Sequence, residues 1–396
     1  MKRILFGWIV LSLPVFAGFS SAQSTKSAKV TKPQTTVPVT KPVNRQTLEM
    51  VFVLDTTGSM SGLLEGAKQR IWGIVNDVMR QDSRPAVRVG LVAYRDRGDQ
   101  YVTQVLPLTE DLDQVYSTLM DYRADGGGDT PEDVRRAMSE ALTKTGWSVD
   151  NRNVAQIMFL VGDAPPHNDY KDEPDTAVTA SQAINRGIIV NTIQCGSMSE
   201  TTPVWELIAQ RGQGRFFAIP QDGGVQAITT PYDTKLTELG NRLGQTYTPY
   251  GGGAGPAGER YRQGSATDQV AMESKVMSAG APSANADRAI NKAVNSAAYV
   301  GDLLQSIENG TVKLDAVKTE DLPDDLKKLT PAARQVEVEK RLAQRATIRA
   351  EILTLGKQRT DFIAAEQRKQ TGTKQNGFDS AVADALKTQM AAKGIK

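Results

Sequence analysis

Four runs of almost uninterrupted apolar residues stand out in the first half of the chain. Strands that are buried on both faces of a parallel sheet have this composition, so each run predicts such a strand. Between the first two runs, apolar residues recur at steps of three and four from Leu64 to Val78, which predicts an amphipathic helix. The four predicted strands are 48–54, 87–94, 155–161 and 187–193.

Weaker patterns complete an alternation of strands and helices. Alternating elements predict the α/β class, with a doubly wound, mostly parallel sheet that carries helices on both faces in a Rossmann-like manner. Ligands of such sheets bind beyond the carboxyl ends of the strands. The additional strands are expected at 101–108, as an edge strand, and at 215–219. The additional helices are expected at 112–122, from Thr130 and Pro131 onward, at 177–185 and at 204–210.

The N-terminal part of the chain is interpreted as an export signal followed by a tether. Residues 1–22 combine two basic residues, a short apolar run and small residues at 20–22, as a cleaved signal peptide does. An uncleaved membrane anchor is disfavoured because the run is short and contains Pro14. Residues 23–47 are rich in Lys, Thr and Pro and contain no acidic residue, which predicts a disordered basic linker. We therefore expect a periplasmic or secreted protein with no stable membrane span after cleavage.

A second break in the pattern separates the α/β region, residues 48–250, from the rest of the chain. The segment 251–268 begins with a run of glycines and is expected to be a linker. Residues 269–396 have a helix-forming composition, which predicts an α-helical C-terminal region. Within it, an apolar stripe runs from Ile290 to Ile307 and predicts one helix.

A longer helix is expected from Ala332 to about Lys369. Its apolar residues recur at a spacing near 3.5, but Arg345 and Arg359 lie on the same seam, which predicts a weak coiled coil. An antiparallel helical hairpin packed on itself and a docking surface for another protein both remain open for this region.

The composition excludes several kinds of binding and catalytic site. The chain has 47 basic and 45 acidic residues, a net charge of +2, so general binding of nucleic acid is not expected. One cysteine and one histidine exclude an intramolecular disulfide, zinc clusters and triads that need two such groups. Cys195 is interpreted as an inert core thiol. His167 is interpreted as a residue whose hydrogen bond holds its loop, with a pH-sensing role as the alternative.

Three polar clusters fall at the expected ligand-binding edge of the sheet. Asp55, Thr57 and Ser59 follow the first predicted strand at alternate positions, so their oxygens can converge in an extended turn. A glycine-rich loop ends in Thr130, and Asp163 follows a later strand. Two carboxylates and three hydroxyls are the hard oxygen donors that Mg²⁺ or Mn²⁺ prefers. Such a set leaves water or an open position that an acidic group from another molecule can fill.

These residues resemble the metal-ion-dependent adhesion site of von Willebrand factor type A (VWA) domains. The resemblance spans residues 48–250, and its three motifs occur in the expected order. The segments 55–60 and 162–167 are most similar to a group of exported bacterial proteins of this type. The resemblance implies a VWA fold and a binding function rather than an enzymatic one.

The resemblance also implies roles for the five residues. The hydroxyls of Thr57 and Ser59 would contact the metal directly. Asp55 and Asp163 would act directly or through water, and Thr130 would join in one of two states. A protein partner would then supply a carboxylate. The implied function is an exported adhesion or assembly module that depends on Mg²⁺ or Mn²⁺.

Two other interpretations remain open. The segment that begins at Asp55 also resembles the phosphorylated-aspartate motif of haloacid-dehalogenase-like phosphatases and ion pumps, so a magnesium-dependent hydrolase with Asp55 as nucleophile is the alternative function. This resemblance is imperfect, because the pump motif has Lys in place of Thr56 and the phosphatase motif has Asp in place of Thr57. A metal-independent scaffold built on the same fold is the third possibility.

Overall fold

The computed structural model describes five segments of the chain, and all of them lie in one compact unit, Val37–Lys396. The predicted signal peptide, 1–22, and the predicted linker up to residue 45 lie outside the described residues. The described residues are 46–79, 85–149, 152–224, 228–369 and 377–395.

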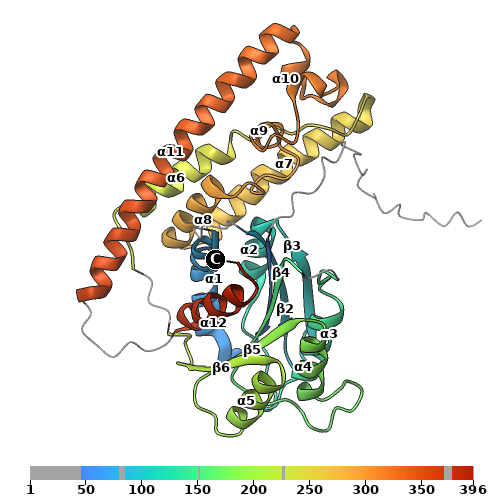
Figure 1. The fold of residues 1–396 in the computed structure, drawn as a ribbon, viewed down its shortest axis with the longest axis vertical. Coiled ribbons are helices and arrows are strands. Elements are labelled where there is room, and N and C mark those ends of the chain that lie inside the picture. Colours follow the sequence, from blue (N-terminus) through green and yellow to red (C-terminus); the bar gives the residue numbers. More distant parts are fainter. Residues whose placement is uncertain (1–45, 80–84, 150–151, 225–227, 370–376, 396) are drawn as a thin grey trace, which may run out of the picture. The chain divides into compact units, whose positions relative to one another are not determined.

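A six-stranded sheet forms the core of the first half of the chain (Figure 1). Its strands are β1 (Thr47–Asp55), β2 (Ala86–Tyr94), β3 (Thr103–Thr109), β4 (Val154–Gly162), β5 (Ile188–Cys195) and β6 (Gln213–Ile219). Their order across the sheet is β3-β2-β1-β4-β5-β6, and only the edge strand β3 pairs antiparallel with its neighbour. The predicted doubly wound, mostly parallel sheet with an edge strand after residue 100 is therefore confirmed.

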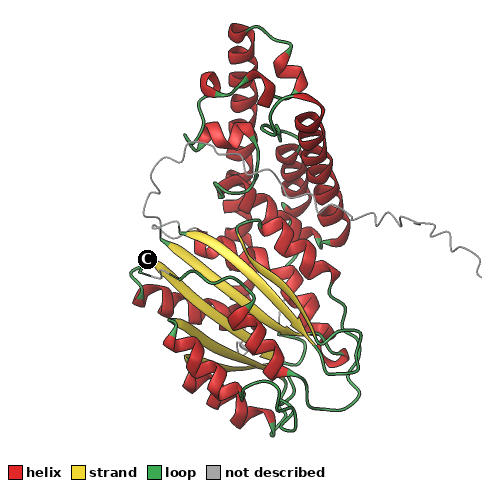
Figure 2. Ribbon diagram, turned by 90° about the vertical axis from the view of Figure 1, so that its right-hand side faces the viewer, coloured by secondary structure: helices red, strands yellow, loops and turns green. Residues whose placement is uncertain are grey.

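Helices cover both faces of this sheet, as Figure 2 shows. Along β1, Phe52 and Leu54 belong to one apolar cluster, whereas Val51 and Val53 belong to the other. Cys195 is fully buried, as predicted, and burial raises the pKa of its thiol well above the ordinary value. The first cluster includes residues of α1 (Ser61–Met79), which follows the short 3₁₀ helix Gly58–Met60, and of α2 (Leu112–Asp121). The second cluster includes residues of α3 (Val134–Thr143), α4 (Thr176–Asn185) and α5 (Thr201–Arg211).

The chain after β6 is helical, as expected, but two boundaries differ from the prediction. The glycine run does not extend as a linker to residue 268, because a helix begins at Gly255, with Pro256 in its first turn, where a missing N–H breaks no bond. The apolar stripe from Ile290 to Ile307 is divided between two helices. The elements are α6 (Asp233–Gly244), α7 (Gly255–Ala279), α8 (Pro282–Val294), α9 (Leu303–Glu308), the 3₁₀ helices Leu314–Ala316 and Thr319–Asp321, α10 (Asp324–Lys327) and α11 (Pro331–Lys369). None of the helices in the described segments has an apolar stretch long enough to cross a bilayer.

The last helix, α12 (Phe378–Ala392), packs on the sheet. The Phe378 ring lies 6.0 Å from the ring of Phe52 in β1. The side-chain amides of Gln389 and Asn191 exchange two hydrogen bonds of 2.7 and 3.0 Å. Residues 269–396 therefore do not form one separate helical region, because their final helix completes the core of the α/β region.

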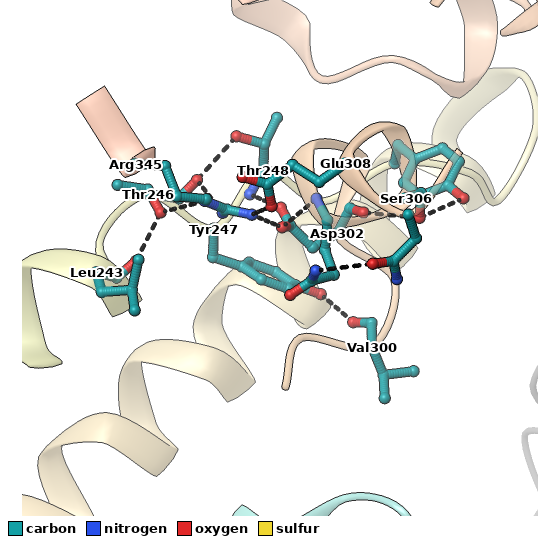
Figure 3. A network of polar contacts seen from close by, with 12 residues as sticks. Leu243, Thr246, Tyr247, Thr248, Val300, Asp302, Ser306, Glu308 and Arg345 are labelled. Carbon is teal, nitrogen blue, oxygen red and sulfur yellow. Dashed lines mark hydrogen bonds and ion pairs between the residues drawn. The ribbon is translucent and has the colours of Figure 1, made fainter. Parts of the chain in front are cut away.

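The long helix α11 packs against α6, α8 and α9. It is not half of a hairpin packed on itself, because its described partners come from earlier in the chain. The arginines on its seam are buried and paired: Arg359 Nε donates to Asp233 and its Nη1 to Asp287, both at 2.7 Å. Arg345 forms an ion pair with Asp302, at the N-terminus of α9 (Figure 3). Acidic partners from other helices thus explain how this polar seam is buried.

Replacing two helical glycines by alanine should change the stability of the protein in opposite directions, because one glycine lies at the close approach of α6 to α8 and the other has open space beside it. A Cβ at Gly240 would lie 2.8 Å from the Cβ of Ala289, whereas a Cβ at Gly264 of α7 would meet nothing within 4 Å. We expect Gly240→Ala to lower the free energy of unfolding by about 1–3 kcal/mol through overpacking. We expect Gly264→Ala to raise it by about 0.5–1 kcal/mol, because alanine is the better helix former. Urea unfolding measures both, and equal effects would contradict the packing.

Candidate metal centre

The carboxyl ends of β1 and β4 meet at one edge of the sheet. The two strands are parallel neighbours, so Asp55 at the end of β1 and Asp163 directly after β4 leave the sheet together. The glycine-rich loop reaches the same place, because the Gly58 N–H donates a 3.4 Å hydrogen bond to the Gly126 carbonyl. Topology thus brings the three predicted clusters to one edge.

Asp55 lies at the centre of this edge. Its side chain is fully buried, and its Oδ1 accepts hydrogen bonds from the Thr57 N–H at 2.9 Å and from the Thr57 hydroxyl at 2.6 Å. The Thr57 Oγ1 lies 3.4 Å from the Ser59 Oγ. The second carboxylate oxygen, Asp55 Oδ2, is buried and has no hydrogen-bond partner. An unpaired buried carboxylate oxygen is unfavourable, and a bound cation would satisfy it.

Asp163 is held by Gln221, a residue that the sequence analysis did not identify. The Gln221 Nε2 donates to Asp163 Oδ2 at 2.6 Å and to the Ser59 carbonyl at 3.2 Å. A Cβ at Gly162 would lie 3.1 Å from Asp55 Oδ2, so the residue before Asp163 has to be small. No local pattern points to Gln221, because it follows β6, far along the chain from the other residues.

Thr130 is the predicted ligand that the structure does not join to the others. Its side chain is exposed, and no hydrogen bond within the described segments links it to another of the five residues. Helix α3 begins at Val134 rather than at Pro131, because the Asp133 side chain caps it by accepting a 3.0 Å hydrogen bond from the Arg136 N–H. Thr130 therefore lies in the preceding loop and stays a predicted ligand.

The electrostatics of the site favour a bound cation. Burial raises the pKa of Asp55 to about 7, and the charge of Asp163 acts in the same direction. Burial and the charge of Asp55 raise the pKa of Glu132 to about 9, and its Oε2 is buried without a hydrogen-bond partner. Burial and like charges disfavour ionised carboxylates, and a nearby divalent cation would reverse this effect. The donor set and the unpaired oxygens therefore fit Mg²⁺ or Mn²⁺.

A second group of potential ligands lies on the neighbouring loops. This group consists of Asp96, which follows β2, Asp129 in the glycine-rich loop, and His167, which follows β4. Each of the three offers one ligand atom, and these atoms all lie within 4.8 Å of one another. The His167 Nδ1 lies 2.9 Å from Asp169 Oδ1, which confirms the predicted loop-holding hydrogen bond.

The raised pKa of Asp55 predicts that cation binding depends on pH. Metal ligands must be deprotonated, and a carboxyl group with a pKa of about 7 is mostly protonated at pH 6 and mostly ionised at pH 8. We expect Mg²⁺ to bind about tenfold more weakly at pH 6 than at pH 8, with release of a proton. Titration calorimetry at both pH values, in buffers of different ionisation enthalpy, measures both effects. An affinity that is the same at both pH values would contradict this role of Asp55.

Comparison with known proteins gives matches to the sheet region. Residues 49–230 match the family described as von Willebrand factor A domain. A protein of Acanthamoeba polyphaga mimivirus, named ariadne-like RING finger protein R811, is 28% identical over 125 residues. The aligned part is 32% of this chain and 12% of that protein, so the chain spans only a small part of the relative's length.

Two solved structures are also similar to the chain. The SpRpn10 VWA domain has a TM-score of 0.34 and 16% identity, and the similarity covers 45% of this chain and 89% of that one. Proximal thread matrix protein 1 from the mussel byssus has a TM-score of 0.33 and 12% identity, with 45% of this chain and 43% of that one covered.

Proposed function

We propose that this chain, whose residues 49–230 match the von Willebrand factor A domain family, is an exported protein-binding module that depends on a divalent cation. Mg²⁺ or Mn²⁺ would be held by oxygen ligands at the carboxyl edge of the sheet and would keep one position open. An acidic group of a protein partner would fill that position. The proposed ligands are Asp55, Thr57, Ser59, Thr130 and Asp163.

The observation that carries this proposal is the unpaired Oδ2 of Asp55. This oxygen is buried and belongs to the carboxylate that accepts a hydrogen bond from the Thr57 hydroxyl and whose pKa the charge of Asp163 helps to raise. A buried acceptor without a donor is rare in folded proteins. A cation at this position would accept the lone pair of Asp55 Oδ2 and reduce the repulsion between the two carboxylates.

The proposed mechanism is binding without turnover. The carboxylate of the partner would replace water on the cation, and no covalent bond would break. The phosphatase alternative requires Asp55 as an exposed anionic nucleophile, whereas its side chain is fully buried and burial raises its pKa to about 7. Incubation with a generic phosphomonoester tests this alternative, for which we expect neither hydrolysis nor a phosphorylated chain.

Two neighbouring serines test the cation site. Ser59 and Ser61 are both exposed, but only Ser59 has its Oγ near that of Thr57, at 3.4 Å. We expect Ser59→Ala to weaken Mg²⁺ and Mn²⁺ binding by at least about tenfold, because it removes one ligand, and Ser61→Ala to leave it unchanged. Titration calorimetry measures both. Equal affinities for the two variants, or no binding by the wild-type protein, would contradict the proposal.

The partner and the export route need separate tests. A pull-down from envelope extract should recover a protein with Mg²⁺ but not with chelator, and the Ser59→Ala protein should recover less of it. Recovery that is the same with chelator would contradict cation dependence. Export rests on the pattern of residues 1–22. The mass of the chain isolated from its host should correspond to cleavage after Ala22, and an intact N-terminus would contradict a cleaved signal.

A further inference from the structure

Three loops beside the proposed adhesion site place a histidine between two carboxylates. The His167 Nε2 lies 3.4 Å from Asp96 Oδ2 and 3.6 Å from Asp129 Oδ1. The ligand atoms of the three residues all lie within 4.8 Å of one another. None of these residues belongs to the proposed ligand set of the adhesion site.

The orientation of the His167 ring is determined by its other contacts. Its Nδ1 lies 2.9 Å from Asp169 Oδ1, its ring stacks on Tyr170 at 4.2 Å, and its backbone N–H donates to the Glu132 carbonyl at 3.1 Å. Because Nδ1 faces a carboxylate, which only accepts, the ring proton belongs on Nδ1. In the neutral ring the Nε2 is then an acceptor.

This acceptor faces only further acceptors. The Nε2 atom is buried and has no hydrogen-bond partner. The groups that face it at 3.4 and 3.6 Å are carboxylate oxygens of Asp96 and Asp129. The Tyr170 hydroxyl donates to both oxygens of Asp96 at 3.1 Å, which orients that carboxylate. Three acceptors that converge in this way need a positive charge between them.

The distances fit a metal ion better than a shared proton. A tetrahedral ion with bonds of about 2.0–2.1 Å places its ligand atoms about 3.3–3.4 Å apart. The observed separations of 3.4 and 3.6 Å lie close to this value. A direct N–H···O hydrogen bond would be about 2.7–3.2 Å long. A histidine whose second nitrogen is held by a carboxylate, as Asp169 holds His167, is also the common arrangement around a metal.

We propose that Asp96, Asp129 and His167 form a second cation site that binds a divalent transition metal, Zn²⁺ in particular. One imidazole nitrogen and two carboxylate oxygens are a suitable ligand set for Zn²⁺, and the nitrogen disfavours Mg²⁺. Three protein ligands leave a fourth position for water or for a ligand from another molecule. Asp129 adjoins Thr130, so this ion would sit beside the loop that contributes to the adhesion site.

The test uses the untagged full-length chain, so that His167 is its only histidine. We expect one Zn²⁺ to bind per chain in the presence of millimolar Mg²⁺, and X-ray absorption at the zinc edge to show one imidazole ligand. Because the chain has a single histidine, that signal identifies His167. No Zn²⁺ binding in Mg²⁺, or bound Zn²⁺ without an imidazole ligand, would overturn the proposal.

Matched variants separate this site from the adhesion site. We expect His167→Ala and Asp129→Asn each to weaken Zn²⁺ binding more than about 100-fold, and Asp169→Asn to weaken it about 10–100-fold, as loss of a positioning residue does. Asp129 is 60% exposed, so its replacement should leave the fold intact. Ser59→Ala should retain Zn²⁺ binding while it weakens Mg²⁺ binding. Zn²⁺ binding that is lost in Ser59→Ala but retained in Asp129→Asn would overturn the proposal.

Discussion

Asp55→Asn is expected to abolish Mg²⁺ binding and, in the presence of chelator at pH 8, to stabilise the protein. The variant removes the charged ligand but keeps an oxygen that can accept the hydrogen bonds from Thr57. In the metal-free wild-type protein, burial raises the pKa of Asp55 from 3.8 to about 7. The carboxylate therefore ionises less readily in the folded chain than in the unfolded one.

The sign of the pH effect follows from this difference. Between pH 4 and pH 7 the unfolded chain loses the Asp55 proton while the folded chain retains it, so the free energy of unfolding falls as the pH rises. Each unit of pKa difference corresponds to about 1.4 kcal/mol. We therefore expect Asp55→Asn to be more stable than the wild-type protein by about 2–4 kcal/mol at pH 8 and by much less at pH 4.

An exposed aspartate in the same loop cluster provides the control. Asp125 Oδ1 accepts a 2.9 Å hydrogen bond from the Gly126 N–H, which an asparagine oxygen can also accept. Asp125→Asn should keep Mg²⁺ binding and change stability by less than about 0.5 kcal/mol. Urea unfolding with chelator at both pH values and calorimetry with Mg²⁺ measure the two effects. Wild-type Mg²⁺ affinity in Asp55→Asn, or its destabilisation at pH 8, would contradict the role of this residue.

The four central strands of the sheet were predictable because they are buried on both faces and are therefore apolar along most of their length. The position of α11 followed from the spacing of its apolar residues, but its packing partners did not. The sequence of α12 carries no sign that this helix packs on the sheet, because contacts such as Phe378 with Phe52 join residues far apart in the chain. The start of α7 at Gly255 was not predicted, because a run of glycines predicts a linker. In the structure Pro256 lies in the first turn of the helix, which tolerates proline.

The candidate site was predictable to the extent that its residues lie at strand ends. Asp55 and Asp163 directly follow buried strands, and the sheet order places those strands side by side. Gln221 and Glu132 reach the site from separate loops, and nothing in their local sequence distinguishes them from ordinary polar residues. Contacts between distant loops therefore require the structure.

Arg345→Met is expected to give a large loss of stability in the helical part of the chain. The side chains of Arg345 and Asp302 are both fully buried and form an ion pair (Figure 3). Arg345 also donates to the hydroxyl of Thr246 at 2.9 Å and to its carbonyl at 3.0 Å. Methionine fills much of the same volume but leaves the carboxylate of Asp302 buried without its cation. We expect the free energy of unfolding to fall by about 3–5 kcal/mol.

Arg341, one turn earlier in α11, provides a matched control. It pairs with Asp325 and Glu337, and its side chain is 26% exposed, so water can replace these partners. Arg341→Met should therefore cost only about 0–1 kcal/mol. Urea unfolding of both variants measures the difference, and equal losses would contradict the assignment of the cost to burial. The double variant Arg345→Met with Asp302→Asn should recover part of the loss, because the greater part of that loss arises from the unpaired carboxylate rather than from the missing attraction.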